Sequence, residues 1–408
     1  MIQAPKGTKD ILPNDVEVWH FMESTAEKVF KNAGFSEIRT PVFEATNLFA
    51  RGVGDSTDIV NKEMYTFEKS ERSLTLRPEN TAGVVRAYIE NGFSRVAPPV
   101  KLYYKGPMFR YERPQAGRQR QFHQIGVEMF GEAAALADAE CINLAVSYLK
   151  QLGLNELQVE LNSLGCPTCR AKFKQDLKDV FKKYLPDLCE DCKVRFEKNP
   201  LRILDCKNEK CIQIFENSEI KNLVEKSFIC GECSEHFEEV KSYLDALNIK
   251  YNVNPKLVRG LDYYNRTVFE IKASKLGSQN AVCGGGRYDG LVEMLGGAPT
   301  PAVGWAMGME RLSMLIEKQE STMLEYFIIS DNAKEAFMLA DELRRKGHSC
   351  DYDYRARKFN KQLEKALKVA KNAIILGEDE LSAKSVTIKN FETTQQKTIL
   401  RKDFLENT

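Results

Sequence analysis

A pair of strand-like segments joined by a basic loop constrains the fold of this chain more than any other feature. Residues 103–111 and 122–130 are rich in aromatic and β-branched side chains, with a polar stretch between them. In the second segment every other residue is apolar and would face a core. The residues between these, Gln124, Gly126 and Glu128, share the opposite face, where the glycine leaves a notch for a small polar ligand. The sequence therefore predicts an antiparallel hairpin with a polar recess.

The loop of this hairpin concentrates positive charge. Four arginines stand against one glutamate, a net charge of +3, and they are Arg110, Arg113, Arg118 and Arg120. Guanidinium groups bind phosphate oxygens in a two-pronged geometry, so the loop is a candidate phosphate site. A solvated hairpin with surface arginines explains the same residues without any ligand.

Three later segments combine glycine with polar or charged side chains. Residues 257–266 hold Arg259 and two adjacent tyrosines ahead of a strand. Residues 281–290 contain a glycine triplet without the Lys-Ser/Thr of a P-loop, which favours close approach of the backbone to a ligand. Residues 302–316 predict a helix on which two glycines clear space in front of Arg311. Each segment also has a purely structural explanation, in which these residues serve packing or a salt bridge.

The order of periodic segments predicts one core domain that is interrupted and then followed by a second domain. Strand and helix patterns alternate to about Leu152, a Cys- and Lys-rich helical region follows over roughly 166–251, and strand signals return at 257. Residues 317–322 are typical of a linker. Beyond them, a strand–helix–helix–strand order predicts a small α/β unit.

Eight of the eleven cysteines lie between residues 166 and 233. Without a secretory leader, thiols or metal ligands are expected rather than disulfides. The spacing C-x2-C, 19 residues, C-x2-C, followed by C-x4-C, 18 residues, C-x2-C, fits two tetrahedral Zn²⁺ sites. In chain order, the ligand sets would be Cys166, Cys169, Cys189 and Cys192, then Cys206, Cys211, Cys230 and Cys233. Reduced thiols on helices, without metal, are the alternative.

Composition excludes several classes of protein. With 43% hydrophobic and 29% charged residues the chain is globular, and no apolar run approaches the roughly 18–20 residues that span a bilayer. The lack of a secretory leader favours a cytoplasmic protein with no membrane partner. A net charge of +1 argues against a polyanion partner, yet residues 355–371 hold seven basic residues and one acid, a net charge of +6. A solvated basic helix is the simplest explanation of that stretch.

Together, and in order along essentially the whole chain, these segments resemble the histidyl-tRNA synthetase family of class II aminoacyl-tRNA synthetases. The class-level motifs correspond to residues 34–43, to the hairpin beginning Phe109-Arg110-Tyr111-Glu112, and to residues 304–312. Two segments resemble motifs specific to the histidine enzymes, namely Arg259-Gly-Leu-Asp-Tyr-Tyr264 and Gly284-Gly-Gly-Arg-Tyr-Asp-Gly290.

The resemblance implies an α+β fold, in which helices flank an antiparallel class II sheet. The catalytic core would comprise residues 1–165 and 253–318, with a mostly helical insert at 166–252 and a C-terminal α/β anticodon-binding domain at 323–408. The first class motif builds dimer interfaces in class II enzymes, so a homodimer is expected. Contacts to tRNA phosphates would come from Arg355, Arg357, Lys358, Lys361, Lys365 and Lys368.

The activity implied by the resemblance is histidine–tRNA ligation. L-Histidine and ATP, with Mg²⁺, would form histidyl-adenylate and pyrophosphate, and the histidyl group would then move to the 3′ end of its tRNA. Positioning and fixed cations would lower the barrier, because the transition state spreads negative charge over the α-phosphate. Arg110 would hold the α-phosphate, and Arg118 and Arg311 the outer phosphates. Arg259 would lie beside the reacting carboxylate and phosphate.

The resemblance also implies a histidine pocket. Glu79, Thr81 and Gln124 would bind the α-amino group. Glu128 and Tyr264 would bind the imidazole nitrogens, and apolar analogues would leave these groups unpaired. The full histidine-binding set is Glu79, Thr81, Arg110, Gln124, Glu128, Arg259, Tyr263, Tyr264 and Tyr288.

Two other functions remain open on the sequence. A catalytically inactive, synthetase-like regulatory subunit of histidine biosynthesis would share the fold, but such paralogues typically lose histidine-specific residues and the anticodon domain. A zinc-ribbon nucleic-acid binder would explain the cysteines but not the hairpin, the glycine triplet or the segment at 304–312.

Overall fold

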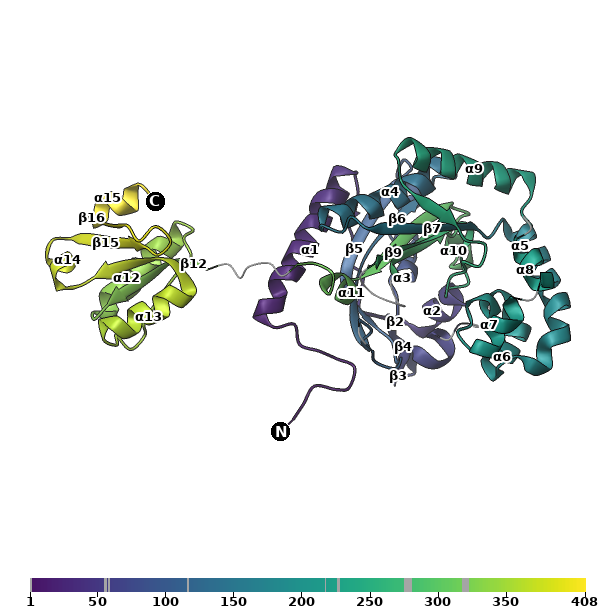
Figure 1. Cartoon of the computed structure of the whole chain (residues 1–408), viewed down its shortest axis with the longest axis horizontal. Coiled ribbons are helices and arrows are strands. Elements are labelled where there is room, and N and C mark those ends of the chain that lie inside the picture. Colours follow the sequence, from purple (N-terminus) through teal and green to yellow (C-terminus); the bar gives the residue numbers. More distant parts are fainter. Residues whose placement is uncertain are drawn as a thin grey trace. The chain divides into compact units, whose positions relative to one another are not determined.

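The computed structural model describes residues 2–54, 57, 59–115, 117–216, 218–225, 228–274, 281–317 and 323–408. They belong to two compact units, Met1–Gln319 and Glu320–Thr408 (Figure 1). The linker predicted at residues 317–322 lies, apart from Glu317, outside the described residues. No helix in the described part of the chain is long and apolar enough to cross a membrane.

An eight-stranded sheet forms the centre of the first unit, in the order β1-β5-β6-β11-β10-β9-β7-β8. The pairs between these strands are antiparallel except at the two edges, where β1 runs parallel to β5 and β8 to β7. The strands are β1 Ser36–Glu37, β5 Val100–Phe109, β6 Gln121–Phe130, β7 Leu157–Ser163, β8 Tyr251–Val253, β9 Asn265–Ala273, β10 Ala281–Arg287 and β11 Ala302–Gly308. The predicted hairpin is the pair β5–β6, so the alternation along residues 122–130 was informative.

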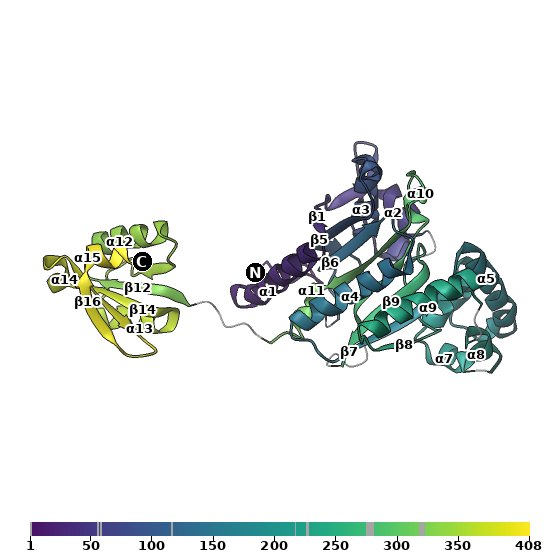
Figure 2. The same ribbon diagram turned by 90° about the horizontal axis from the view of Figure 1, so that it is seen from above.

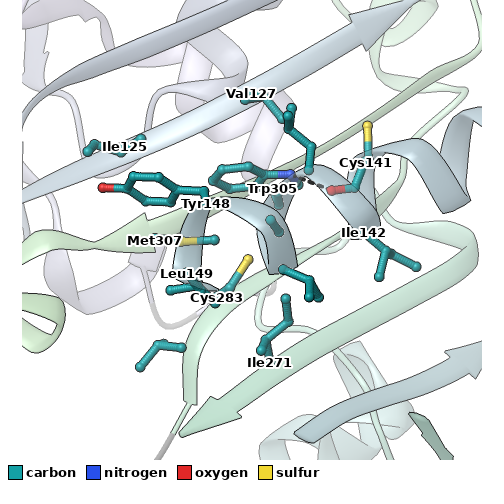
Figure 3. Close-up of a cluster of buried hydrophobic side chains, with 14 of the residues drawn as sticks. Ile125, Val127, Cys141, Ile142, Tyr148, Leu149, Ile271, Cys283, Trp305 and Met307 are labelled. Atoms are coloured by element: carbon teal, nitrogen blue, oxygen red, sulfur yellow. Dashed lines mark hydrogen bonds between the residues drawn. The ribbon is translucent and has the colours of Figure 1, made fainter. Parts of the chain in front are cut away.

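Three helices cover one face of this sheet: α1 Pro13–Asn32, α4 Ala135–Gln151 and α9 Gly231–Ala246. In Figure 2, α4 and α9 lie side by side across the strands. As predicted, Ile125, Val127 and Met129 of β6 point into this core. Figure 3 shows Trp305 among the buried side chains, where its Nε1 donates a hydrogen bond of 2.9 Å to the carbonyl oxygen of Cys141 on α4.

The opposite face carries shorter elements that stand around the candidate site. A second buried cluster joins this face to α3 and α10, through side chains such as Val84, Tyr88 and Leu291. These elements are α2 Thr46–Val53, η1 Ile59–Glu63, α3 Thr81–Glu90, η2 Phe93–Arg95, α10 Leu291–Met294 and a three-stranded sheet of β2 Phe43–Ala45, β3 Tyr65–Lys69 and β4 Arg72–Leu76.

The prediction of one helix over residues 302–316 is wrong. Residues 302–308 form strand β11, and only the short helix α11 Met309–Ser313 follows. A strand forms here because β11 is central in the sheet and pairs with β6 on one side and with β10 on the other. Its side chains alternate between large residues packed in the core and small ones on the other face, which is a period of two rather than 3.6.

The predicted insert is helical and has a hydrophobic core of its own, built around residues such as Phe173, Phe181 and Leu201. Its last helix, α9, belongs instead to the main core through Phe237 and Val240. The preceding elements are α5 Pro167–Phe181, η3 Lys182–Asp187, α6 Glu190–Lys198, η4 Pro200–Asp205, α7 Glu209–Phe215 and α8 Ser218–Glu225.

The second unit is a five-stranded mixed sheet in the order β13-β12-β14-β15-β16, with helices. The predicted strand–helix–helix–strand order is present, and the short strand β13 and the hairpin β15–β16 complete the sheet. The strands are β12 Leu324–Ser330, β13 Cys350–Tyr352, β14 Ala370–Leu376, β15 Ser385–Asn390 and β16 Gln396–Leu400. The helices are α12 Ala333–Arg345, α13 Phe359–Val369, α14 Glu378–Ser382 and α15 Arg401–Glu406.

Candidate active site

A cavity of about 610 Å³ opens on the face of the large sheet that lies opposite α4 and α9. Its walls come from segments far apart in the chain, including α3, the β5–β6 hairpin, residues 254–264 and strands β9, β10 and β11. The predicted site residues that line it are Glu79, Thr81, Arg110, Arg118, Gln124, Arg259, Tyr263, Tyr264 and Arg311. The structure thus gathers nine of the predicted residues around one space.

The start of α3 supplies the acidic end of the cavity. The carboxylate of Glu79 accepts hydrogen bonds from the backbone N–H groups of Thr81, at 2.7 Å, and Ala82, at 3.0 Å. These donors are the unpaired amides of a helix N-terminus, which a carboxylate satisfies. Glu79 is buried, and burial raises the pKa of its carboxyl group above the ordinary value.

Glu128 and Tyr288 lie directly behind this end rather than in the cavity lining. Both are about 1% exposed, and the Tyr288 hydroxyl donates to Glu128 Oε2 over 2.5 Å. Glu128 Oε1 accepts a second hydrogen bond, of 2.7 Å, from the Thr81 hydroxyl. Burial raises the pKa of Glu128 to about 8. A methyl group on Gly304 would lie 1.9 Å from Glu128 Oε2, so only glycine leaves room for this carboxylate.

Three tyrosines form a connected wall. The ring centroid of Tyr263 lies 4.6 Å from that of Tyr264 and 5.5 Å from that of Tyr288. Tyr263 and Tyr264 line the cavity, whereas Tyr288 reaches it only through its contact with Tyr263. The wall therefore links the cavity surface to the buried carboxylate of Glu128.

The notch predicted at Gly126 is not open to a ligand. Gly126 pairs with Tyr104 across the hairpin, and a methyl group on the glycine would lie 2.4 Å from the Tyr104 hydroxyl oxygen. The phenol of Tyr104 fills the space, lines the cavity and is 1% exposed. Its hydroxyl lies near Thr81 and Glu128 but makes no well-formed hydrogen bond among the described residues, and neither does the amide oxygen of Gln124. Tyr104 was missed because the alternation within one strand does not give the register with its neighbour.

Three arginines of the hairpin and of α11 also line the cavity. The Nε of Arg110 donates to the carbonyl oxygen of Pro78 at 2.8 Å, and its guanidinium lies 5.3 Å from the centre of the Phe122 ring. Arg118 forms an ion pair of 3.4 Å with Glu112. Arg311 donates to the carbonyl oxygen of Ala281 at 2.8 Å. Guanidinium groups suit phosphate oxygens, so these three side chains are candidate phosphate contacts.

The backbone of the glycine triplet lies close to another group, as predicted, but that group is a side chain of the protein and not a ligand. A methyl group on Gly284 would lie 1.9 Å from Nη2 of Arg259. Nη1 of the same arginine donates to Glu270 Oε2 at 2.9 Å, which fixes the orientation of the guanidinium. Glu270 also lines the cavity and was missed, because nothing in its surrounding sequence marks it.

The insert contributes to the cavity as well. Arg202, Leu204 and Asp205 of η4 are among the lining residues, although the sequence suggested no role for them. Asn199, which directly precedes η4, donates through Nδ2 to Asp262 Oδ1 at 2.6 Å. A short helical segment of the insert thus lies against residues 259–264.

The eight clustered cysteines form two groups, but not those predicted in chain order. One group is Cys166, Cys169, Cys230 and Cys233, and the other is Cys189, Cys192, Cys206 and Cys211. Within each group the sulfur atoms lie within 4.8 Å of one another. The first C-x2-C segment joins the last in one group because α5 and α9 begin side by side. The spacing of cysteines in the sequence does not show which helices are neighbours. All eleven cysteines are free.

The predicted tRNA-binding residues lie on and before α13 in the second unit. All are exposed except Lys365, which is half-buried. The predicted charge of +6 is partly compensated, because Arg357 pairs with Asp353 at 2.5 Å and Lys365 with Asp351 at 3.4 Å. Both acids precede the counted stretch. Lys361 pairs with Glu364 at 3.0 Å.

Comparison with known proteins agrees with this architecture. The family model for histidyl-tRNA synthetase matches residues 7–169 and 217–312, and an anticodon binding domain model matches residues 325–407. The histidine--tRNA ligase of Caldanaerobacter subterraneus is 48% identical, covering 98% of this chain and 97% of the relative. That of Acetivibrio thermocellus is 49% identical, with the same coverage. The crystal structure of apo S. aureus histidyl-tRNA synthetase matches with a TM-score of 0.82 and 36% identity, covering 100% of this chain and 99% of that one. The chain belongs to the histidyl-tRNA synthetase family.

Proposed function

We propose that the cavity is where the chain activates L-histidine with ATP before it charges tRNA. The function of the chain is histidine–tRNA ligation, with ATP and Mg²⁺ as the substrate complex. The observation that carries the assignment to this cavity is its polarity. Four guanidinium groups line it together with carboxylate, amide and phenol groups. A nucleotide and a small amino acid require these two chemistries at a short distance.

In the first step, a carboxylate oxygen of histidine attacks the α-phosphorus and the bond to pyrophosphate breaks. Neither reactant must lose a proton, so the protein contributes position and positive charge. Arg110 holds the α-phosphate, and Arg259, oriented by Glu270, neutralises the charge shared by the carboxylate and the phosphate. Arg118 and Arg311 hold the outer phosphates. These roles are supported by the presence of all four guanidinium groups in the lining of one cavity.

The amino acid occupies the opposite end. Glu79, Thr81 and Gln124 receive the α-ammonium group, with the unpaired amide oxygen of Gln124 as one acceptor. Glu128 and Tyr264 bind the imidazole nitrogens. Glu128 accepts one hydrogen bond on each oxygen, from Thr81 and Tyr288, which orients the carboxyl group and leaves acceptor sites for an imidazole N–H.

The walls of this pocket are Tyr263 and Tyr288, and we add Tyr104 as a further polar contact. Its hydroxyl is buried without a well-formed hydrogen bond among the described residues, and a ligand that supplied one would remove that cost. Discrimination against apolar analogues follows, since they would leave the phenol and carboxylate groups without partners.

The partners beyond the small substrates are tRNA and a second copy of the chain. The basic residues Arg355, Arg357, Lys358, Lys361, Lys365 and Lys368 contact tRNA phosphates. A two-fold homodimer forms through residues 34–43. Support comes from Val42 and Phe43, which are 40% and 49% exposed, and from Phe67 beside them at 44%. The eleven free thiols suit the reducing cytoplasm. The two cysteine groups hold structural Zn²⁺ and take no part in the chemistry.

Charging of tRNA separates this function from that of a regulatory subunit of histidine biosynthesis. The test is the transfer of radiolabelled L-histidine to histidine tRNA in the presence of ATP and Mg²⁺. We expect the label in acid-precipitable tRNA. Histidine binding without any charging would instead favour the regulatory function, which is the less supported of the two because identity of nearly half extends over the whole chain.

A further inference from the structure

The two cysteine groups have the geometry of metal sites. A tetrahedron of sulfur atoms around Zn²⁺, with Zn–S bonds of about 2.3 Å, has edges of about 3.8 Å. The sulfur atoms of Cys166 and Cys169 are 3.6 Å apart, and those of Cys189 and Cys206 are 3.8 Å apart. A disulfide would require about 2.05 Å. Four thiols at these separations match the ligand number and spacing of a closed zinc site.

The backbone around the first group is arranged to stabilise thiolates. Cys166 and Cys230 are the N-cap residues of α5 and α9, where helix N-termini favour negative charge. The bonds between the two turns are reciprocal. The N–H of Cys166 donates to the sulfur of Cys233 at 3.2 Å, and the N–H of Cys230 donates to that of Cys169 at 3.1 Å. Hydrogen bonds of this kind hold the ligand atoms of a metal site in position.

The second group repeats this arrangement within the insert. Cys189 is the N-cap residue of α6, and its N–H donates to the sulfur of Cys211 at 3.4 Å. The N–H of Asn208 donates to the sulfur of Cys206 at 3.4 Å. Because Cys192 lies on α6 and Cys206 directly follows η4, this group encloses the η4 segment that lines the cavity.

Each group carries one hydrogen-bonding tether to residues 259–264. Arg170 directly follows Cys169, and its Nη1 donates to the carbonyl oxygens of Asp262, at 2.7 Å, and Tyr264, at 2.9 Å. Asn199, between α6 and η4, donates to the Asp262 side chain at 2.6 Å. The insert therefore contacts the segment that presents Arg259 and Tyr264 to the cavity through Arg170, which adjoins the first cysteine group, and through Asn199, which lies between Cys192 and Cys206 of the second.

We propose that each group binds one Zn²⁺ through four thiolates, and that the two ions fix Arg170 and Asn199 as positioning residues for the histidine end of the cavity. The first ion joins the point where the chain enters the insert to the point where it leaves, and the second closes η4 against residues 259–264. The positioning role rests on the proposed function of the cavity, whereas the metal sites do not depend on it.

Metal content tests the sites directly. Chain purified with zinc and washed with a mild chelator should contain two zinc per chain by elemental analysis. The double variant C169S/C233S removes two ligands of one group and should retain one zinc. If the ligands instead grouped in chain order, this variant would damage both sites and retain none. Fewer than two zinc in the unmodified chain, or none in the double variant, would overturn the proposal.

Kinetics test the positioning role. Arg170→Ala should retain two zinc and raise the KM for histidine in ATP–pyrophosphate exchange about tenfold, with a smaller change in the KM for ATP, because two charged hydrogen bonds to the histidine-side segment are lost. Lys172→Ala, on the exposed side of the same helix, is the matched control and should behave as the unmodified chain. An unchanged KM for histidine in Arg170→Ala would refute the tether. Failure of exchange in the unmodified chain would refute the proposed function while leaving the zinc count intact.

Discussion

Tyr288 donates a 2.5 Å hydrogen bond to Glu128 in the interior of the large unit, where both side chains are about 1% exposed. The carboxyl group lies on the central sheet behind the cavity lining, in a space that exists because residue 304 has no side chain. A buried carboxyl group with a pKa of about 8 is uncharged at neutral pH until a partner stabilises its charge.

Stability should therefore depend on pH through Glu128. Its pKa is raised from 4.5 to about 8 on folding, so the folded chain binds more protons than the unfolded chain between these values. The contribution to stability is fully present below about pH 4.5 and is lost as the pH rises through 8, with a slope of at most about 1.4 kcal/mol per pH unit. The melting temperatures of Glu128→Gln and of the unmodified chain should diverge when they are measured from pH 5.5 to 8.5. The variant should lose less stability as the pH rises. Parallel profiles would show that Glu128 ionises normally.

The glycine triplet should be intolerant of a methyl group at its first position. In Gly284→Ala the new Cβ would meet the Arg259 guanidinium, so the side chain must leave its position beside Glu270. We expect histidine-dependent exchange to fall at least about tenfold with little change in melting temperature. Gly290→Ala is the matched control, since no atom lies within 4 Å of a Cβ there. Equal activity in the two variants would remove the argument that Arg259 needs this close approach.

The hydroxyl of Tyr104 should matter to the ligand more than to the fold. It makes no well-formed hydrogen bond among the described residues, so Tyr104→Phe should leave the melting temperature within a few degrees. The KM for histidine should rise several-fold. Tyr103→Phe changes the neighbouring residue on the opposite face, whose hydroxyl lies 3.4 Å from Glu37 Oε2, and should not alter that KM. An effect of the same size in both variants would argue against a ligand contact by Tyr104.

The basic stretch of the second unit should act on tRNA alone. The triple variant K358E/K361E/K368E reverses three exposed charges and should raise the KM for tRNA. This KM should also depend less steeply on salt concentration than in the unmodified chain. Exchange needs no tRNA and should keep its rate. The exposed Lys397→Glu on β16 is the control for charge reversal elsewhere in the unit. Unchanged charging kinetics in the triple variant would place tRNA contacts on another surface.

Patterns within one strand or one turn were readable in the sequence. The alternation around Gln124 and Glu128 placed both side chains on the cavity side of β6, and the acidic, tyrosine and arginine residues carried over from the family resemblance came together. The segment at 302–308 was misread because glycine and alanine weaken the contrast between polar and apolar positions, and both periodicities then fit the same residues.

Relations between distant segments were not readable. Three features depend on how two distant parts of the chain meet. They are the register that places Tyr104 over Gly126, the approach of η4 to the cavity, and the grouping of Cys166 with Cys233. A strand pattern gives the faces of that strand but not its neighbours, and cysteine spacing gives the number of ligands but not their grouping. These features follow only once the tertiary fold is known.

The most direct test is histidine-dependent exchange of radiolabelled pyrophosphate into ATP, measured for the unmodified chain and for Arg259→Ala. Exchange should occur with L-histidine and not with other amino acids, and Arg259→Ala should lower its rate on the order of a hundredfold, because a preorganised cation beside the transferring phosphate is lost. Folded chain that shows no histidine-dependent exchange, or an Arg259→Ala variant with nearly the full rate, would contradict the assignment of this cavity to histidine activation.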